Sequence, residues 1–309
     1  MVTGASGFIG RRLCATLRER GFDIDSVVRD ASVADSIKVG SIGTNTEWRS
    51  TLTTRPRIVI HLAGRAHSMK DEALDPLTEY CRVNVQGTLN LASQAAAAGV
   101  ERFVFLSSVK VNGESTNGSR FFTGEDSPAP QDAYGLSKWG AERGLWEIAS
   151  PTGMEVVVVR PPLVYGPGVK GNFARLLALV RSGVPLPLSA VNNRRSFVGL
   201  DNLVDLLIRC VDHPGAEGKT LMVSDGQDLS TPELLRMMAN AMGRSARLFP
   251  VPVPLLRLGG RALGRLHEVD RLVGSLQVDN SATCEILGWT PPVSVEEGVR
   301  MMVTGTPRS

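Results

Sequence analysis

The stretch TGASGFIG, residues 3–10, places three glycines at the spacing GxxGxxG, directly before a helical pattern of apolar residues at Ile9, Leu13 and Leu17. Glycines at this spacing permit a tight strand-to-helix turn and a close approach of the backbone to a ligand. The first N–H groups of the helix, together with its dipole, then favour a phosphate group. The stretch predicts a pyrophosphate-binding turn at the start of a βαβ unit. The alternative is a plain turn between packed elements.

Around this turn, short β-branched runs alternate with helical stretches through the first half of the chain. Such alternation is typical of parallel strands joined by helical crossovers. Three of the expected strands are almost wholly apolar, as strands covered by helices on both faces are. The sequence therefore predicts the α/β class, with a doubly wound parallel sheet of the Rossmann type. The strands are expected at Ser26–Arg29, Ile58–Leu62, Phe103–Ser107 and Val156–Arg160, and the helices at Ile9–Arg20, Leu77–Ala98 and Ala133–Ala149.

The character of the chain changes after Pro161, where glycine and proline become frequent. We expect a helix at Phe173–Arg181, and a helix at Phe197–Cys210 and a strand at Lys219–Val223 that return to the sheet. The Pro-rich stretch Phe249–Gly264 shows no strong periodicity. We therefore predict a dinucleotide-binding domain of residues 1–165 with about 197–224, and a smaller C-terminal α/β substrate domain of residues 166–196 and 225–309.

The first strand is the least usual element, because only three residues precede the glycine loop. Central strands usually have about 5–6 residues. Either this strand is unusually short or the natural start lies upstream of Met1, and we expect the second.

Composition excludes several classes of protein. Hydrophobic residues make up 42% of the chain and charged residues 21%, as in soluble globular proteins. The net charge of +3 comes without a long Lys/Arg block, so the sequence predicts no nucleic-acid partner. No apolar run reaches the ~18 residues of a membrane helix, and we expect a cytoplasmic protein. The four scattered cysteines predict neither a disulfide framework nor a metal site.

Arg29 follows the second expected strand, where the residue type selects the cofactor. An acidic residue there holds the ribose 2′-hydroxyl of NAD, whereas an arginine accommodates the 2′-phosphate of NADP. The sequence therefore favours NADP(H). NAD(H) is the alternative, with Arg29 solvated and Asp30 reaching the ribose.

Tyr134 and Lys138 lie four residues apart in an expected helix, so they share one face. An ammonium near a phenol favours phenolate and lowers a pKa that is ordinarily ~10. Such a tyrosine exchanges a proton with an alcohol or a carbonyl. Ser107 and Ser108 end a strand at the carboxyl edge of the expected sheet, where ligands bind. These residues predict a proton-transfer site. The alternative is a chance spacing and an ordinary strand-ending turn.

Together these motifs resemble the extended short-chain dehydrogenases/reductases, in the NAD-dependent epimerase/dehydratase group typified by UDP-glucose 4-epimerase. The resemblance covers nearly the whole chain. It includes HLAG at 61–64, VNVQGT at 83–88, RPPLVYGPG at 160–168, RSFV at 195–198 and LGW at 287–289. It implies the family's fold, a nicotinamide cofactor and a nucleotide-sugar substrate.

The resemblance also implies roles for individual residues. Tyr134 is expected to be the catalytic acid/base, Lys138 to tune its pKa, and Ser108 to contact the sugar oxygen. Counting back from Gly113, which matches the glycine of the family's VYG segment, selects Ser108 over Ser107. Asn84 matches an asparagine behind the active site, or else ties a strand to a helix. The expected cofactor contacts are Gly4, Gly7, Phe8, Ile9, Gly10, Arg29, Leu62, Ala63, Gly64, Asn84, Tyr134, Lys138 and Pro161. The expected substrate contacts are Ser108, Val109, Lys110, Asn172, Arg195 and Arg271, with the two arginines at the diphosphate.

Departures from the family pattern narrow the expected reaction. Val109 and Lys110 stand where sugar 4,6-dehydratases carry an Asp-Glu pair, and related epimerase-reductases need a cysteine at the place of Val109. Leu163 replaces an asparagine of the family's RPFNVYG segment, so one polar substrate contact is lost or moved. What remains is hydride transfer at C4 of the sugar, with Tyr134 handling the O4 proton.

Two reactions at C4 fit this set. The first, favoured by Arg29, is NAD(P)H-dependent reduction of a UDP-4-keto-6-deoxy-N-acetylhexosamine in bacterial O-antigen or capsule synthesis. Segments 107–113 and 193–198 resemble a subgroup of such enzymes, although many of its members are named UDP-glucose 4-epimerase. The alternative is a 4-epimerase of UDP-hexoses or UDP-N-acetylhexosamines with tightly bound NAD. A remote alternative is a non-catalytic NADP-binding sensor.

Family members often dimerise through helices that match Leu89–Ala98 and Ala133–Ala149. This predicts a homodimer joined by a four-helix bundle, although the Ala-rich run 95–98 would also suit a monomer core.

Overall fold

The computed structural model describes residues 1–30, 35–65, 75–117 and 120–306. Its main sheet has seven parallel strands in the order β3-β2-β1-β4-β5-β6-β9. The order changes direction between β1 and β4, which is where ligands bind in open α/β sheets. The predicted doubly wound parallel sheet is therefore confirmed. Its strands are β1 (Val2–Thr3), β2 (Ser26–Val28), β3 (Ser36–Lys38), β4 (Ile58–His61), β5 (Arg102–Leu106), β6 (Glu155–Arg160) and β9 (Thr220–Met222).

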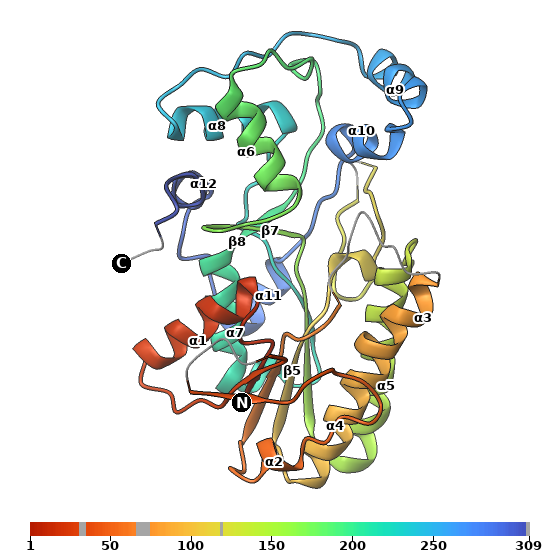
Figure 1. Ribbon diagram of the computed structural model, residues 1–309, viewed down its shortest axis with the longest axis vertical. Helices are drawn as coiled ribbons and strands as arrows, with labels where there is room; N and C mark the ends of the chain where they lie inside the picture. The colour runs from red at the N-terminus through yellow and green to blue at the C-terminus, as the bar shows by residue number, and fades with distance from the viewer. Residues whose placement is uncertain (31–34, 66–74, 118–119, 307–309) are drawn as a thin grey trace.

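Helices cover both faces of this sheet (Figure 1). One face carries α1 (Phe8–Glu19), α7 (Leu200–Asp212) and α11 (Ser281–Leu287), and the other carries α3 (Pro76–Tyr80), α4 (Gly87–Ala97) and α5 (Ala133–Thr152). Because side chains alternate along a strand, the apolar runs of β5 and β6 supply both cores at once. Val104 and Leu106 of β5 pack on the α1/α7 side, whereas Phe103 and Phe105 pack on the α4/α5 side.

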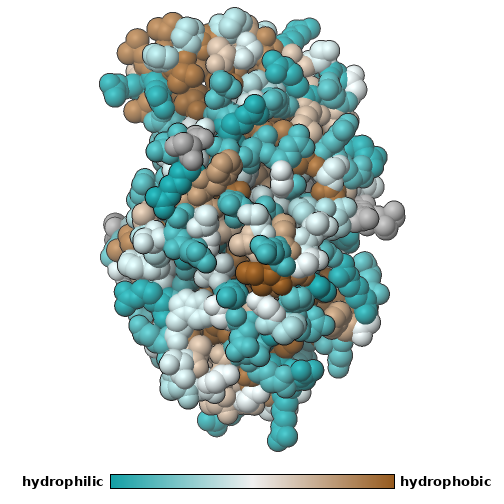
Figure 2. All heavy atoms as spheres, turned by 180° about the vertical axis from the view of Figure 1, so that it is seen from behind, coloured by the Kyte–Doolittle hydropathy of each residue, from teal (hydrophilic) through white to brown (hydrophobic). Residues whose placement is uncertain are grey.

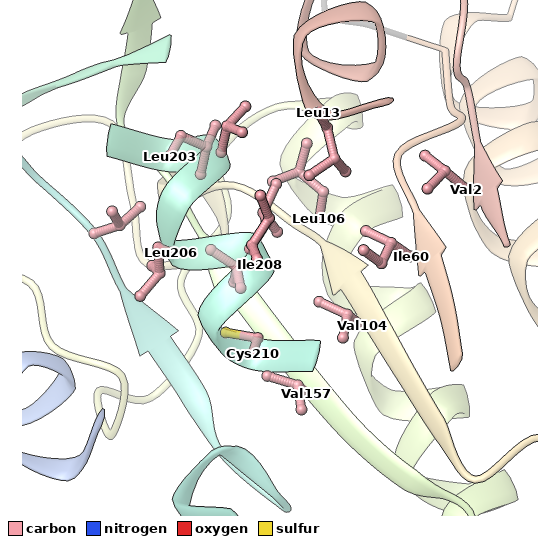
Figure 3. Packing of buried hydrophobic residues seen from close by; sticks show 14 of the residues in the cluster. Val2, Leu13, Ile60, Val104, Leu106, Val157, Leu203, Leu206, Ile208 and Cys210 are labelled. Atoms are coloured by element: carbon pink, nitrogen blue, oxygen red, sulfur yellow. The ribbon is translucent and has the colours of Figure 1, made fainter. Parts of the chain in front are cut away.

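The core on the α1/α7 side shows how the glycine loop is held in place. Leu13 of α1 and Leu203 and Leu206 of α7 converge on strand residues such as Val104 and Val2 (Figure 3). Leu13, Leu203 and Leu206 are fully buried, and each such side chain contributes about 1.5–3 kcal/mol to folding. This packing anchors α1, and with it the turn that precedes the helix.

A second lobe lies above the sheet (Figure 1). A parallel pair, β7 (Leu163–Tyr165) and β8 (Phe197–Gly199), borders a separate core with α6 (Asn172–Ser182), α8 (Thr231–Ala241) and α12 (Val295–Thr304). Beyond them stand α9 (Val253–Ala262) and α10 (Leu266–Val273). Seen from behind, the surface is mostly polar, and hydrophobic side chains gather most densely at this upper end (Figure 2). The residue ranges of the two predicted domains stay a prediction. Leu287 and Trp289, expected in the substrate domain, pack in the core of the main sheet.

Several elements differ from their prediction for local reasons. The helix expected at Leu77–Ala98 has a π-helical middle, η1 (Cys81–Gln86), between α3 and α4. The helix expected from Phe197 starts only at Leu200, because 197–199 pairs with β7 as β8. The stretch Phe249–Gly264 contains α9, in which Leu256 packs against the core of the second lobe but Leu255 and Leu258 are exposed, so its apolar residues form no single buried stripe. The three-residue strands β3 and β7 are too short to carry a pattern. The remaining short elements are α2 (Arg49–Leu52) and the 3₁₀ turns η2 (Val109–Val111) and η3 (Pro214–Ala216).

Within the described ranges, none of the helices has both the length and the apolar character needed to span a membrane.

Candidate active site

The glycine loop connects β1 to α1 at the point where the strand order changes direction. Gly4 has a φ of 71°, and a Cβ on it would stand 2.7 Å from the backbone nitrogen of Ala63. A Cβ on Gly10 would lie 2.1 Å from the carbonyl oxygen of Gly4. Among the described residues, no side chain caps the start of α1 at Gly7, and the first turn of α1 holds no carboxylate. The first N–H groups of the helix, from Phe8 onward, therefore suit an anion. The loop therefore fits the pyrophosphate of a dinucleotide.

The segment after β4 forms the second wall of this cradle. Leu62 donates its N–H to the Thr3 carbonyl oxygen at 3.2 Å, which places Ala63 beside the glycine loop. A Cβ on Gly64 would lie 2.9 Å from Oδ1 of Asn84 and 3.6 Å from Nζ of Lys138. The backbone therefore passes close to two predicted site residues, and glycine is the residue that allows it.

Asn84 is buried in the π-helical segment and uses both ends of its amide within the protein. Its Oδ1 accepts the N–H of Arg65 at 2.7 Å, and its Nδ2 donates to Oγ of Ser137 at 3.0 Å. Ser137 in turn donates to the carbonyl oxygen of Tyr134 at 2.8 Å. This geometry favours a structural role for Asn84, which joins the loop after β4 to α5, over a direct contact with the cofactor.

The two serines after β5 have different environments. Ser107 is buried and donates its hydroxyl to the Glu142 carboxylate. Ser108 is half-buried, accepts the N–H of Lys110 at 3.2 Å, and shares a hydrogen bond with Tyr134. The core thus uses Ser107, and Ser108 is the serine that lies at the phenol.

Lys138 points from α5 to the carboxyl end of β5. Its Nζ donates to the Leu106 carbonyl oxygen at 2.8 Å and lies 4.5 Å from the ring centroid of Phe105. Burial lowers the pKa of Lys138 to about 8, against the opposing effect of the Glu142 carboxylate. The ammonium is therefore held at the sheet edge by a backbone carbonyl.

Tyr134 lies in the first turn of α5 and packs edge-on against Tyr80, with ring centroids 5.8 Å apart. Burial raises the pKa of the Tyr134 phenol above its ordinary value, Asp132 and Tyr80 raise it further, and the hydrogen bond with Ser108 lowers it. The expectation that Lys138 holds this pKa below its ordinary value is therefore wrong for the protein chain alone, where burial is the largest effect and raises the pKa.

The segment after Ser108 holds two predicted substrate contacts in different ways. The side chain of Val109 is buried against Met222 and Leu276, while its N–H donates to the carbonyl oxygen of Pro161 at 3.0 Å. Pro161 is itself buried directly after β6. A substrate contact from Val109 would therefore use its backbone.

Lys110 has two carboxylate partners. Its Nζ lies 2.7 Å from Oε1 of Glu114 and also pairs with Asp132, which caps α5 by accepting the N–H of Gly135 at 2.6 Å. Sequence reasoning missed Glu114 and Asp132 as neighbours of the site. The i,i+4 spacing of Lys110 and Glu114 and the aspartate before a helix were the available signals.

Arg195 and Arg271, 76 residues apart in the chain, lie together in the second lobe. Nη1 of Arg195 donates to the carbonyl oxygens of Arg271 at 3.1 Å and of Gly274 at 3.0 Å. Burial and the neighbouring charge of Arg271 lower the pKa of Arg195, which marks a region of concentrated positive charge. Guanidinium groups whose charges act on each other in this way suit a diphosphate. Asn172 is the first residue of α6 and is half-buried.

Arg29 follows β2 as predicted, and its side chain is 74% exposed. Its Nε lies 3.2 Å from Oδ2 of the equally exposed Asp30. Exposed pairs of this kind are weak, so either side chain can turn toward a bound ribose. The geometry leaves the choice between NADP and NAD to the comparisons and to experiment.

The chain resembles known proteins over its whole length. Residues 1–223 match the NAD dependent epimerase/dehydratase family. A protein from Vibrio cholerae named UDP-glucose 4-epimerase is 46% identical over 305 residues, which cover 97% of this chain and 93% of that protein. A protein from Escherichia coli O157:H7 named N-acetyl-α-D-glucosaminyl-diphospho-ditrans,octacis-undecaprenol 4-epimerase is 27% identical over 274 residues, covering 87% and 80%.

A solved structure has the same architecture. The structure of MoeE5 in complex with UDP-glucose and NAD superimposes with a TM-score of 0.76 at 25% sequence identity, and the match covers 98% of this chain and 97% of that one.

Proposed function

The chain belongs to the NAD-dependent epimerase/dehydratase family, and from this premise we propose that it is a 4-epimerase of a UDP-hexose or UDP-N-acetylhexosamine that retains NAD between turnovers. The observation that carries the proposal is the meeting of Tyr134, Ser108 and Lys138 at the carboxyl end of β5, beside the glycine cradle. The relative at 46% identity bears the name of such an epimerase, which favours this reaction over the reduction that Arg29 led us to expect.

The dinucleotide would be held by the glycine loop and the segment after β4. Gly4, Gly7 and Gly10 leave room for the pyrophosphate at the start of α1, and Ala63 and Gly64 form the facing wall. The NAD-bound structure with the same architecture supports this assignment. When bound, the dinucleotide would supply reversible hydride transfer at C4, and the positive charge of its oxidised ring would favour a phenolate at Tyr134.

Tyr134 would move the O4 proton. As the C4 alcohol becomes a ketone, the phenolate oxygen accepts the O4 proton, and it returns that proton when the ketone is reduced. The hydroxyl of Ser108, already hydrogen-bonded to Tyr134, orients the same sugar oxygen. Lys138 keeps a cation at the sheet edge through its bond to Leu106, so its charge stabilises the phenolate form during the exchange.

Arg195 and Arg271 would hold the diphosphate of the UDP-sugar. Their neighbouring guanidinium groups give charge-assisted hydrogen bonds to phosphate oxygens, and Arg195 is fixed by two backbone carbonyls. Anchoring at the diphosphate leaves the glycosyl bond free to rotate. A 4-keto sugar can thus present either face to the hydride donor without leaving the site.

The direct test is to denature the purified protein, identify the released nucleotide, and then assay interconversion of UDP-glucose with UDP-galactose and of their N-acetyl counterparts. Stoichiometric NAD, epimer interconversion and no net oxidation of added NADH or NADPH are expected. Release of intact NAD together with absence of turnover on every UDP-sugar would instead favour a cofactor-binding sensor.

A second candidate function rests on Arg29, which stands at the end of β2 and is free to turn toward a 2′-phosphate. In that case the protein would reduce a UDP-4-keto-6-deoxy-N-acetylhexosamine with NADPH. Consumption of NADPH in preference to NADH with the keto sugar, by protein that carries little bound nucleotide, would establish the reductase. Arg29→Ala would then weaken NADPH binding, while leaving any NADH activity unchanged.

A further inference from the structure

Positive charge is concentrated in one stretch of the second lobe. Residues 244–273 contain six arginines and two carboxylates, a net charge of +4, whereas the whole chain carries +3. The rest of the chain therefore sums to −1. Arg257 is paired with Asp270 at 2.8 Å, but within the described ranges Arg261 and Arg265 form no ion pair and both are exposed. This stretch presents uncompensated positive charge to solvent.

The same stretch exposes the most apolar surface. Leu263, Leu258 and Leu255 are 76%, 62% and 56% exposed, more than any other large apolar side chain in the described part of the protein, and Phe249 is exposed nearby. Figure 2 shows the corresponding hydrophobic patch at the upper end of the molecule, where α9 lies. Scattered single leucines need no explanation, but a cluster of this kind marks a contact surface.

Helix α9 carries apolar side chains on two sides: Val253 and Leu256 pack against the core of the second lobe, whereas Leu255 and Leu258 face outward. Leu255 and Leu258 are three residues apart and therefore form one stripe along the helix, while Arg257 and Arg261 form a second stripe beside it. Gly260 packs against α10: a Cβ there would lie 2.7 Å from Cγ2 of Val269. The two helices thus form a closely packed pair that is seated on the core through Val253 and Leu256 and leaves Leu255 and Leu258 exposed. We call the exposed residues Phe249, Leu255, Leu258, Arg261, Leu263 and Arg265 the α9–α10 surface.

An open groove of about 630 Å³ joins this surface to the predicted diphosphate site. Leu258, Arg261 and Gly274 all line this groove. The carbonyl oxygen of Gly274 accepts Nη1 of Arg195 at 3.0 Å. Whatever the α9–α10 surface contacts therefore lies next to the arginine pair.

We propose that the α9–α10 surface docks on an anionic lipid bilayer, with the leucines inserted at the level of the headgroups and the arginines paired with lipid phosphates. Apolar side chains fringed by unpaired arginines are the composition of helices that lie in a membrane interface. The charge is complementary to the negative surface of a bilayer that contains anionic lipids. A second copy of this chain docked through the same surface would bury the leucines equally well but would leave Arg261 and Arg265 facing like charge, since the stretch itself is basic. The inference does not depend on the reaction at C4.

The test is flotation of the full chain with vesicles of phosphatidylcholine alone and with about 30% phosphatidylglycerol. Binding is expected to the anionic vesicles only, and it should weaken at 0.5 M salt because screening shortens the electrostatic range. The triple variant Leu255→Glu/Leu258→Glu/Leu263→Glu should bind at least about tenfold more weakly, since three apolar contacts are lost. The pair Arg261→Glu/Arg265→Glu should lose binding to a similar extent. Phe22→Glu, an exposed apolar residue after α1 in the other lobe, is the matched control and should bind like wild type.

Thermal melting of each variant separates loss of docking from loss of folding, and it is independent of the proposed reaction. Three results would overturn the proposal: wild-type protein that stays with the unbound fraction on anionic vesicles, a triple variant that binds as tightly as wild type, or self-association in sedimentation velocity that the triple variant abolishes without any vesicle binding.

Discussion

Glu142 and Arg160 form an ion pair under the active site, and its disruption allows a quantitative prediction. Arg160 donates two hydrogen bonds to Glu142, from Nε to Oε1 at 3.0 Å and from Nη2 to Oε2 at 2.5 Å. Both side chains are buried. Ser107 donates to the same carboxylate, and Asn112 accepts from Nη1 of Arg160 at 3.1 Å. The pair thereby joins α5 to β6 and to the segment that carries Ser108.

Glu142→Ala leaves the buried Arg160 guanidinium without its carboxylate. Removal of one partner from a buried pair costs about 3–5 kcal/mol, because the remaining charge stays desolvated. We therefore expect the free energy of unfolding to fall by this amount. At about 2 °C per kcal/mol for a chain of this size, the melting temperature should fall by about 6–10 °C.

Replacing both partners tests whether the cost comes from the unpaired charge. The double variant Glu142→Leu/Arg160→Met removes both charges and keeps apolar volume, and such replacements are often neutral. We expect it to be more stable than Glu142→Leu or Arg160→Met alone, which a double-mutant cycle of these three variants in urea measures as coupling. The control is Glu101→Ala, because Glu101 forms a similarly forked but exposed pair with Arg57, and its loss should change stability little.

The reasoning is refuted if Glu142→Ala costs less than about 1 kcal/mol, or if the double variant is as unstable as the two single changes together. Either result would mean that water or relaxation of the backbone solvates Arg160, so that the pair does not fix the segment that carries Ser108.

Three further predictions concern the proton chemistry of the site and the core beneath it. Tyr134→Phe should lower turnover of the UDP-sugar about 10²–10⁴-fold with bound dinucleotide retained, and near-wild-type turnover would remove Tyr134 from the mechanism. Asp132→Asn keeps an N-cap but removes the charge that raises the pKa of Tyr134, so the acidic limb of the pH–rate profile should move to lower pH, and a shift to higher pH would contradict the assignment. His61 is buried between Thr3 and Thr88, and burial lowers its pKa to about 3, below its unfolded value, so the stability it lends is present above about pH 6.5 and is lost as the pH falls. Urea unfolding at pH 7 and pH 5 should differ by about 2 kcal/mol more in wild type than in His61→Gln, and equal differences would show that His61 is protonated in the fold.

Most of the fold and the centre of the site could be predicted from local sequence motifs. The glycine loop, the strand-ending serines and the Tyr134–Lys138 spacing are short-range patterns, so the sequence was sufficient to predict the parallel sheet and the residues at its carboxyl edge. The choice of Ser108 over Ser107 came from the family resemblance, and the structure gives it a physical reason, because Ser107 is bonded to Glu142.

Long-range features could not be predicted in the same way. The pairing of Lys110 with Asp132 joins residues from two elements, and the charge on Asp132 contributes to raising the pKa of Tyr134. The effect of Lys138 was overestimated because an i,i+4 spacing indicates a shared face but does not tell how deeply the phenol is buried. Likewise α9 could not be predicted, because Gly259 and Gly260 are poor helix formers and its apolar residues are divided between a buried and an exposed side.

The π-helical segment shows how the fold positions the catalytic residues without touching the substrate. A π-turn inserts one residue into a helix and redirects the side chains around it. In η1, Asn84 lies between the backbone of Arg65 and the side chain of Ser137. Its amide therefore joins the loop after β4 to α5, the helix that carries Tyr134 and Lys138. The Glu142–Arg160 pair does the same from the middle of α5 for the segment with Ser108. Both ties use polar groups that are costly to bury and are therefore well satisfied only in one arrangement. A uniform helix from Leu77 to Ala98 would be the simpler fold, but it would leave the loop after β4 without its bond to α5.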